Sequence, residues 1–240
     1  MPELSIIYED EQYIAVNKPA GMLVHRTPLE KDPEALFAMI ILRDQIGKKV
    51  YPLHRLDRPT SGVLLFSKSS EAASRLQPDF ASHGIKKYYL AVVRGFLPDA
   101  RGIINQPLSK DLDQELQDAS SEYWRLAEVE IPFSSSPRYT SSRYSLVKVF
   151  PHTGRMHQIR RHFAHLRHYI IGDSTHGDNK QNKFFRLHFQ SNHLLLHAWV
   201  LQFTQPYTGE DIYIKAEVSP QLEYIINSLG WKTVLEEING

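Results

Sequence analysis

The chain has 240 residues, enough to bury a sizeable core, and its composition gives no sign of disorder. It contains no cysteine, which excludes disulfides, thiolate zinc sites and a cysteine nucleophile. No apolar run approaches membrane-spanning length, and the N-terminus lacks the basic start and apolar core of a signal peptide. These features fit the reducing cytosol, so we expect a cytoplasmic protein without contact to a membrane.

Strands, helices and turns alternate irregularly along the chain. Apolar runs predict strands over residues 4–8, 13–17, 63–66, 88–94, 126–131, 143–150, 169–171, 194–203 and 211–218. Capping residues and helical spacing predict helices over residues 34–46, from about residue 71, over 155–167 and over 220–229. Residues 109–122 and 179–183 are predicted to be polar loops. The frequent hairpins favour an α+β fold over a doubly wound parallel sheet.

No repeat or linker divides the chain, so we expect a single domain over residues 1–240.

One carboxylate stands in a conspicuous loop. Asp57 lies between Arg55 and Arg58, and a turn follows that ends at Gly62. A nucleophilic carboxylate must be ionised and held in position, and a nearby arginine lowers its pKa. From this loop alone, a surface turn in which Asp57 pairs with Arg58 is the favoured interpretation.

The charge is distributed unevenly although the net charge is only +1. No acidic residue lies between Glu130 and Asp173, whereas this interval holds many arginines and histidines. One-sided basic character is typical of a surface that binds nucleic acid. The predicted helix over 155–167 would present Arg160 and Arg161 on its polar face, where guanidinium groups can bind phosphates.

The histidines of this interval also suggest a metal site, because His162 and His165 share a helical face. Acidic and cysteine ligands are missing from the interval, and the arginines would repel a cation, so we expect no metal. The tyrosines Tyr88 and Tyr89, beside Lys86 and Lys87, are candidates for stacking on a nucleobase. Packing in the core is the alternative for them.

Several motifs in order resemble the RluA-type pseudouridine synthases. The signature motif is similar to His54-Arg55-Leu56-Asp57 followed by Thr60-Ser61-Gly62. Further motifs resemble Asn17-Lys18-Pro19-Ala20-Gly21, Lys87-Tyr88-Tyr89, Thr153-Gly154-Arg155-Met156-His157-Gln158-Ile159-Arg160 with Gly172-Asp173, and Leu196-His197-Ala198. The resemblance implies the pseudouridine synthase catalytic fold, a mixed and mostly antiparallel sheet with flanking helices and a central cleft.

The resemblance also implies roles for individual residues. Asp57 matches the catalytic aspartate, Tyr89 the active-site tyrosine, and Arg155 the arginine that pairs with the aspartate. Substrate binding is implied for Arg55, which would replace the flipped base in the RNA stack, and for Ile159 in the uracil pocket. His54, Arg160 and Arg161 complete the expected substrate-binding set. The implied reaction needs no cofactor and no metal.

Some positions depart from the common pattern. Arg167-His168-Tyr169 stands where the family has Gly-x-Pro, and His176 stands where it has tyrosine. Together with Arg58-Pro59 and the lack of an appended RNA-binding domain, they resemble a subgroup that acts on uridine 65 of tRNA. We therefore expect a monomer that modifies tRNA. Ribosomal RNA as substrate, or a non-catalytic RNA-binding module, are the alternatives.

Overall fold

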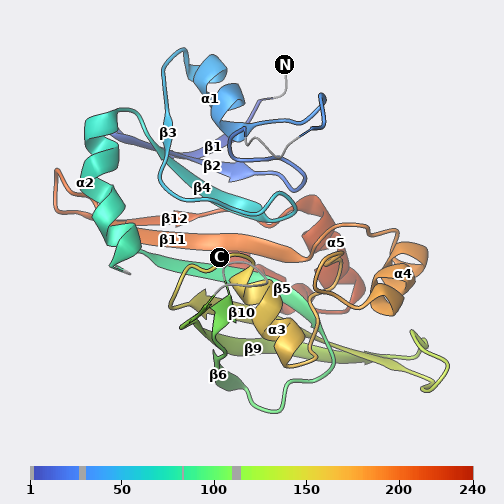
Figure 1. The fold of residues 1–240 in the computed structure, drawn as a ribbon. Coiled ribbons are helices and arrows are strands. Elements are labelled where there is room, and N and C mark those ends of the chain that lie inside the picture. Colours follow the sequence, from blue (N-terminus) through green and yellow to red (C-terminus); the bar gives the residue numbers. More distant parts are fainter. Residues whose placement is uncertain (1–2, 27–30, 83, 110–114, 240) are drawn as a thin grey trace. The chain divides into compact units, whose positions relative to one another are not determined.

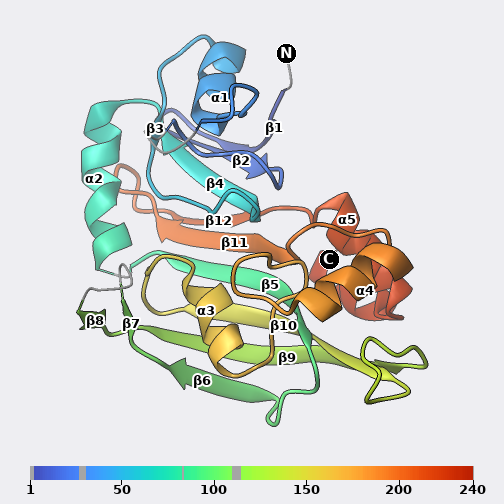
Figure 2. The same cartoon turned by 45° about the vertical axis from the view of Figure 1, so that its right-hand side comes forward.

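The computed structural model describes residues 3–26, 31–82, 84–109 and 115–239 (Figures 1 and 2). The chain forms two compact units, unit 1 with Met1–Lys87 and Ala198–Glu217 and unit 2 with Tyr88–His197 and Val218–Gly240. The chain passes between the units three times, inside strands β5 (Lys86–Arg94) and β11 (Leu196–Thr204) and between Glu217 and Val218. The single domain expected over residues 1–240 stays a prediction.

Unit 1 is built on a sheet in which β1, β2, β4 and β11 are neighbours in this order, while β3 pairs with β4 and β12 with β11. The strand bounds are Ser5–Glu9 for β1, Tyr13–Lys18 for β2, Tyr51–Pro52 for β3, Ser61–Ser67 for β4 and Asp211–Lys215 for β12. Its helices are α1 (Ala38–Ile46) and α2 (Ser70–Ala81). All seven residues of β4 are buried, as the apolar run predicted.

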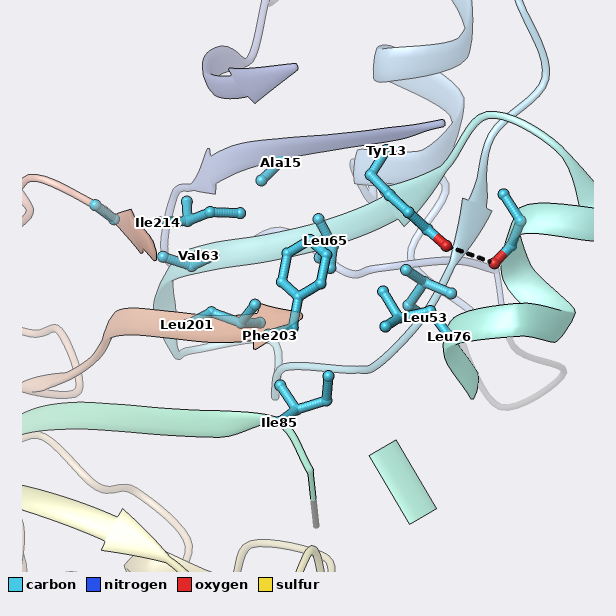
Figure 3. Packing of buried hydrophobic residues seen from close by; sticks show 12 residues of the cluster. Tyr13, Ala15, Leu53, Val63, Leu65, Leu76, Ile85, Leu201, Phe203 and Ile214 are labelled. Atoms are coloured by element: carbon cyan, nitrogen blue, oxygen red, sulfur yellow. Dashed lines mark hydrogen bonds between the residues drawn. The ribbon is translucent and has the colours of Figure 1, made fainter. Parts of the chain in front are cut away.

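The core of unit 1 lies where α2 covers this sheet (Figure 3). Phe203 packs edge-on against Tyr13, with ring centroids 5.7 Å apart. The hydroxyl of Tyr13 donates a hydrogen bond to the carbonyl oxygen of Ala72 in α2, at 3.0 Å. The same cluster includes Val63 and Leu65 of β4, so the core packs α2 against the strand that follows the Asp57 loop.

Unit 2 contains β5, β10 (Ser142–Pro151), β9 (Ser120–Ile131) and β6 (Arg101–Asn105) as neighbouring antiparallel strands. Its helices are α3 (Gln158–His165), α4 (Asn179–His188), α5 (Pro220–Ser228) and α6 (Lys232–Asn239). Phe163 of α3 is fully buried against Val147 and Val149 of β10 and Ala91 of β5 in one apolar cluster.

The α+β prediction is confirmed, but several boundaries differ. Helix α1 begins at Ala38 instead of residue 34, because Phe37 is extended. Helix α3 begins at Gln158, because His157 has a left-handed backbone. The strand predicted over 169–171 is reduced to one bridge between Ile170 and Val93.

Two segments that were predicted to be loops contain regular secondary structure. Residues 179–183 belong to α4, so the loop prediction there is wrong. In the segment 109–122, β7 (Leu108–Ser109) pairs with β8 (Leu116–Gln117), while residues 110–114 lie outside the described part. Helix α6 was not predicted. Among the described residues, no helix is long and apolar enough to cross a membrane.

Candidate active site

The Asp57 loop joins β3 to β4 in unit 1. The Thr60 amide donates to the carbonyl oxygen of Asp57 at 3.0 Å, which closes a turn directly before β4. Gly62 has φ +111°, and a Cβ atom there would lie 2.1 Å from the carbonyl oxygen of Ala198. Only glycine fits this backbone and this close approach, which explains its place in the signature motif.

A second turn, at residues 18–22, holds the Asp57 loop in place. Lys18 is fully buried, and its ammonium donates to the carbonyl oxygens of Pro19 and Met22 at 2.9 Å and of Arg58 at 3.3 Å. The Gly21 amide donates to the same Arg58 carbonyl at 2.8 Å. Because Arg58 adjoins Asp57, these bonds fix the backbone that carries the carboxylate.

The charge of Asp57 also affects the pKa of Lys18. Burial lowers the pKa of Lys18 to about 7, and the negative charge of Asp57 opposes this shift. The ammonium group donates to three carbonyl oxygens, and these hydrogen bonds offset part of the cost of its burial. The sequence did not reveal this role of Lys18, which lies two residues after the apolar run 13–16.

The two arginines of the loop differ in their surroundings. Arg58 is exposed and donates from Nε to the Gly21 carbonyl oxygen at 3.0 Å, and its Nη2 pairs with Asp32 at 3.0 Å. The side chain therefore links the Asp57 loop to Gly21 and Asp32. Arg55 is exposed, as a residue that reaches into an RNA stack must be.

His54 lies against the protein. Its Nε2 accepts a hydrogen bond from the Leu65 amide at 3.0 Å, and its ring stacks on Phe80 with centroids 5.3 Å apart. Burial, and then the charge of Lys87, lower the pKa of His54 to about 3. A neutral ring bound to β4 anchors the start of the loop, so the described contacts give His54 a structural function.

In unit 2, Gln158 organises the turn that carries Arg155. Its Oε1 accepts from the Thr153 hydroxyl at 2.6 Å and from the Arg155 amide at 3.0 Å. Its Nε2 donates to the Ser120 carbonyl oxygen at 2.9 Å and to the Ser121 hydroxyl at 3.0 Å. Gln158 is 4% exposed and joins this turn to β9, a role that the sequence did not reveal.

Arg155 is exposed, and its Nε donates to the Asp118 carbonyl oxygen at 3.1 Å. Two residues later, His157 adopts φ +53° just before α3. Its Nδ1 lies 2.9 Å from Nε2 of His176, a hydrogen-bonding distance. The ring of His176 therefore holds the strained residue at which the Arg155 turn becomes a helix.

Arg160 is not presented to solvent. It is 3% exposed, and its guanidinium donates to both carboxylate oxygens of Asp173 at 2.8 Å. The expectation that Arg160 lies on the exposed polar face of the helix is corrected here, because the side chain is buried and bonds within the protein, while its part in substrate binding stays a prediction. Arg161 is partly buried and donates to the Ser109 carbonyl oxygen at 2.8 Å, so it joins α3 to β7.

Tyr89 and Ile159 meet in one apolar cluster of unit 2, where Ile159 is buried and Tyr89 is partly exposed. Tyr88 lies on the opposite face of β5, as strand alternation requires. It packs 5.2 Å from the ring of Phe150, with the Lys148 ammonium 5.5 Å away. The two tyrosines therefore have different surroundings, and Tyr89 lies on the side of α3.

Two histidines of unit 2 bind protein groups. His162 places Nδ1 3.0 Å from the Ser121 hydroxyl and Nε2 3.1 Å from the Gln106 carbonyl oxygen. His168 places Nδ1 2.9 Å from the Arg94 carbonyl oxygen. Within the described ranges, no three His, Asp or Glu side chains are grouped to hold a metal ion.

The sequence matches known proteins along nearly its whole length. A family model described as RNA pseudouridylate synthase covers residues 12–165. The tRNA pseudouridine synthase C of Vibrio parahaemolyticus is 48% identical over 239 residues, which cover 95% of this chain and 96% of the relative. That of Yersinia pestis is 46% identical over 241 residues, with 96% and 93% covered.

Solved structures support the fold. Human RNA Pseudouridylate Synthase Domain Containing 1 superposes with a TM-score of 0.72 at 23% identity, covering 92% of this chain and 86% of that one. Human RNA Pseudouridylate Synthase Domain Containing 4 gives the same TM-score at 20% identity, with 94% and 93% covered.

Proposed function

Because this chain belongs to the RNA pseudouridylate synthase family and is an RNA pseudouridine synthase, we propose that it converts uridine 65 of tRNA to pseudouridine. The observation that carries the tRNA assignment is the 48% identity, over 95% of the chain, to a relative named tRNA pseudouridine synthase C. The departures at Arg58-Pro59 and His176, which resemble the subgroup acting on uridine 65, support the choice of position.

In the proposed reaction, the bond between N1 of uracil and C1′ of ribose breaks and a bond between C5 and C1′ forms. The C5 proton is then lost and N1 gains one, so no electron donor or acceptor is needed. Asp57 begins the reaction by attacking C1′ or by removing the proton from C2′. A carboxylate can do either only while it is ionised, and a fixed loop avoids the entropy of orienting it.

We assign the supporting roles to Arg55, Tyr89, Arg155 and Ile159. The resemblance implies that Arg155 pairs with Asp57 and orients its carboxylate. Tyr89 stacks on the uracil and assists removal of the C5 proton, beside Ile159 as an apolar wall. The target base must leave its helix at a cost of a few kcal/mol, which Arg55 offsets by filling the gap.

The test of the substrate is modification mapping in a strain from which the gene is deleted. The proposal expects pseudouridine to disappear at position 65 of tRNA and to return when the gene is restored on a plasmid. Loss at a ribosomal RNA position, with position 65 still modified, would contradict the assignment. If no pseudouridine is lost and purified protein releases no tritium from labelled tRNA, the chain is a binding module instead.

A further inference from the structure

Helix α4 carries a basic face that the proposed reaction does not use. Its buried stripe is Gln181 and Phe185, followed by Phe189 at the end of the helix. On the opposite side, Lys180, Lys183 and Arg186 are exposed at three-residue spacing. These three cations, here called the α4 basic face, extend over about 9 Å of helix.

The helix is held firmly beside the hairpin that joins β9 to β10. Gln181 accepts from the Tyr144 hydroxyl at 2.9 Å and donates to the Ser135 hydroxyl at 2.7 Å. The His188 ring lies 4.3 Å from the Phe133 ring in the hairpin. Figures 1 and 2 both show α4 near the tip of this hairpin. The α4 basic face is therefore exposed on a helix whose position is fixed by contacts to β10 and the hairpin.

The acidic residues Asp178 and Glu130, at the start of α4 and at the base of the hairpin, are paired within the protein. No acidic residue occurs between Asp178 and Glu210. The Asp178 carboxylate caps α4 by accepting from the Lys180 amide at 2.8 Å, and it also pairs with Arg94 at 3.0 Å. The hairpin adds the exposed Arg138, while Glu130 at its base pairs with Arg143 at 3.0 Å. Ordinary exposed helices mix both signs of charge, and this one does not.

We propose that the α4 basic face binds the phosphate backbone of the tRNA substrate. This inference rests on the proposed function for the identity of the RNA. Lysine and arginine side chains supply many contacts to phosphates, which position the nucleic acid without reading its sequence. The face thus contributes to affinity and orientation, whereas the Asp57 and Arg155 segments carry the chemistry.

The experiment measures equilibrium binding of a tRNA transcript whose target uridine is replaced by cytidine, over a series of salt concentrations. The triple variant Lys180→Gln, Lys183→Gln and Arg186→Gln removes the charge but keeps good helix formers. The slope of log K against log salt is negative, and each lost phosphate contact reduces its magnitude by about 0.7–0.9. The triple variant should therefore have a slope that is smaller in magnitude by about 2–3. With unmodified tRNA, KM rises and kcat at saturation stays unchanged.

The control variant Lys48→Gln, Lys49→Gln and Lys232→Gln removes three other exposed cations and changes the net charge equally. It should bind tRNA like the unaltered protein. A wild-type slope and KM in the α4 variant, or an equal loss in both variants, would overturn the proposal. Loss of binding to anionic lipid vesicles with intact tRNA binding would also overturn it.

Two measurements on one further variant, its tRNA affinity and its thermal midpoint, separate the effect of charge from that of folding. Lys183→Glu alone reverses the central charge and should weaken tRNA binding with an unchanged thermal midpoint, which separates charge from folding. Because binding is measured on RNA that cannot react, it does not depend on turnover. Failure of the proposed function appears instead as absent pseudouridine formation by the unaltered protein.

Discussion

The guanidinium of Arg160 donates to both carboxylate oxygens of Asp173, each at 2.8 Å, and both side chains are almost completely buried. Asp173 Oδ1 also accepts from the amides of Thr175 and His176 at 2.9 Å. The ion pair therefore connects α3 to the segment that supplies the His176 ring. Through His157, this segment supports the turn of Arg155.

We predict that Asp173→Asn destabilises the protein by about 3–5 kcal/mol, because Arg160 would be left as an uncompensated buried charge. Urea unfolding followed by circular dichroism measures the change. The double variant Arg160→Met with Asp173→Asn should recover part of the lost stability. A single variant as stable as the unaltered protein would show that the pair contributes nothing.

The same pair predicts a pH dependence. Burial would raise the pKa of Asp173, but the hydrogen bonds from Arg160 and the two amides outweigh it and hold the pKa below its usual range. The folded state thus binds this proton less tightly than the unfolded chain. Stability from Asp173 is present above pH of about 4 and is lost as the pH falls further. Asp173→Asn should lack this acid-dependent part.

Replacing Lys18 by methionine should destabilise the protein by about 1–3 kcal/mol, because buried carbonyl oxygens lose their donor. Since the pKa of Lys18 in the folded protein is lowered from 10.5 to about 7, the unfolded chain holds the proton more tightly between these values. Stability of the unaltered protein should therefore rise with pH from about 7 toward 10.5. Lys18→Met should lack this contribution, as urea unfolding at pH 7 and 9 can show.

Two glycine positions give a matched comparison. Gly62 and Gly209 both have positive φ, at +111° and +75°, but only Gly62 faces a backbone atom where a Cβ would lie. Gly209→Ala should cost about 1–2 kcal/mol from backbone strain alone. Gly62→Ala should prevent soluble expression, because the Cβ collides with Ala198. Equal thermal midpoints for the two variants would contradict this account of the signature motif.

The contact between His157 and His176 requires one neutral ring nitrogen as acceptor. A double-mutant cycle with His157→Ala and His176→Ala should give a coupling of about 1 kcal/mol at pH 8. Burial, and the charges of Arg160 and Arg161, lower the pKa of His176, while Asp173 opposes them. The stabilisation is therefore present above pH of about 6.5 and is lost as the pH falls through the lowered pKa of His176. A coupling energy of zero at pH 8 would exclude the shared hydrogen bond.

Sequence patterns predicted the elements whose apolar residues are continuous or alternate. The buried run from Val63 to Phe66 became β4, and the 207–210 turn joined β11 to β12 as expected. Helix α4 was missed because its buried stripe within 179–188 is only Gln181 and Phe185, so polarity dominates the window. The cap at Asp178 was the local signal of a helix.

The family was predictable from the ordered motifs, whereas contacts between residues distant in the sequence were not. Arg160 looked like a phosphate-binding residue because its neighbours in sequence are basic. Its partner Asp173 lies 13 residues away, beyond the helix, and only the fold brings the two together. The buried bonds of Lys18 and Gln158 likewise depend on backbone groups, which carry no sequence signal.

The central claim is that the Asp57 carboxylate performs the reaction. Tritium release from 5-tritiated uridine in tRNA measures it directly, with Asp57→Asn compared to the control Asp99→Asn, which alters an exposed carboxylate. We expect no release above background for Asp57→Asn with tRNA affinity retained, and full activity for the control. Turnover by Asp57→Asn at the rate of the unaltered enzyme would contradict it.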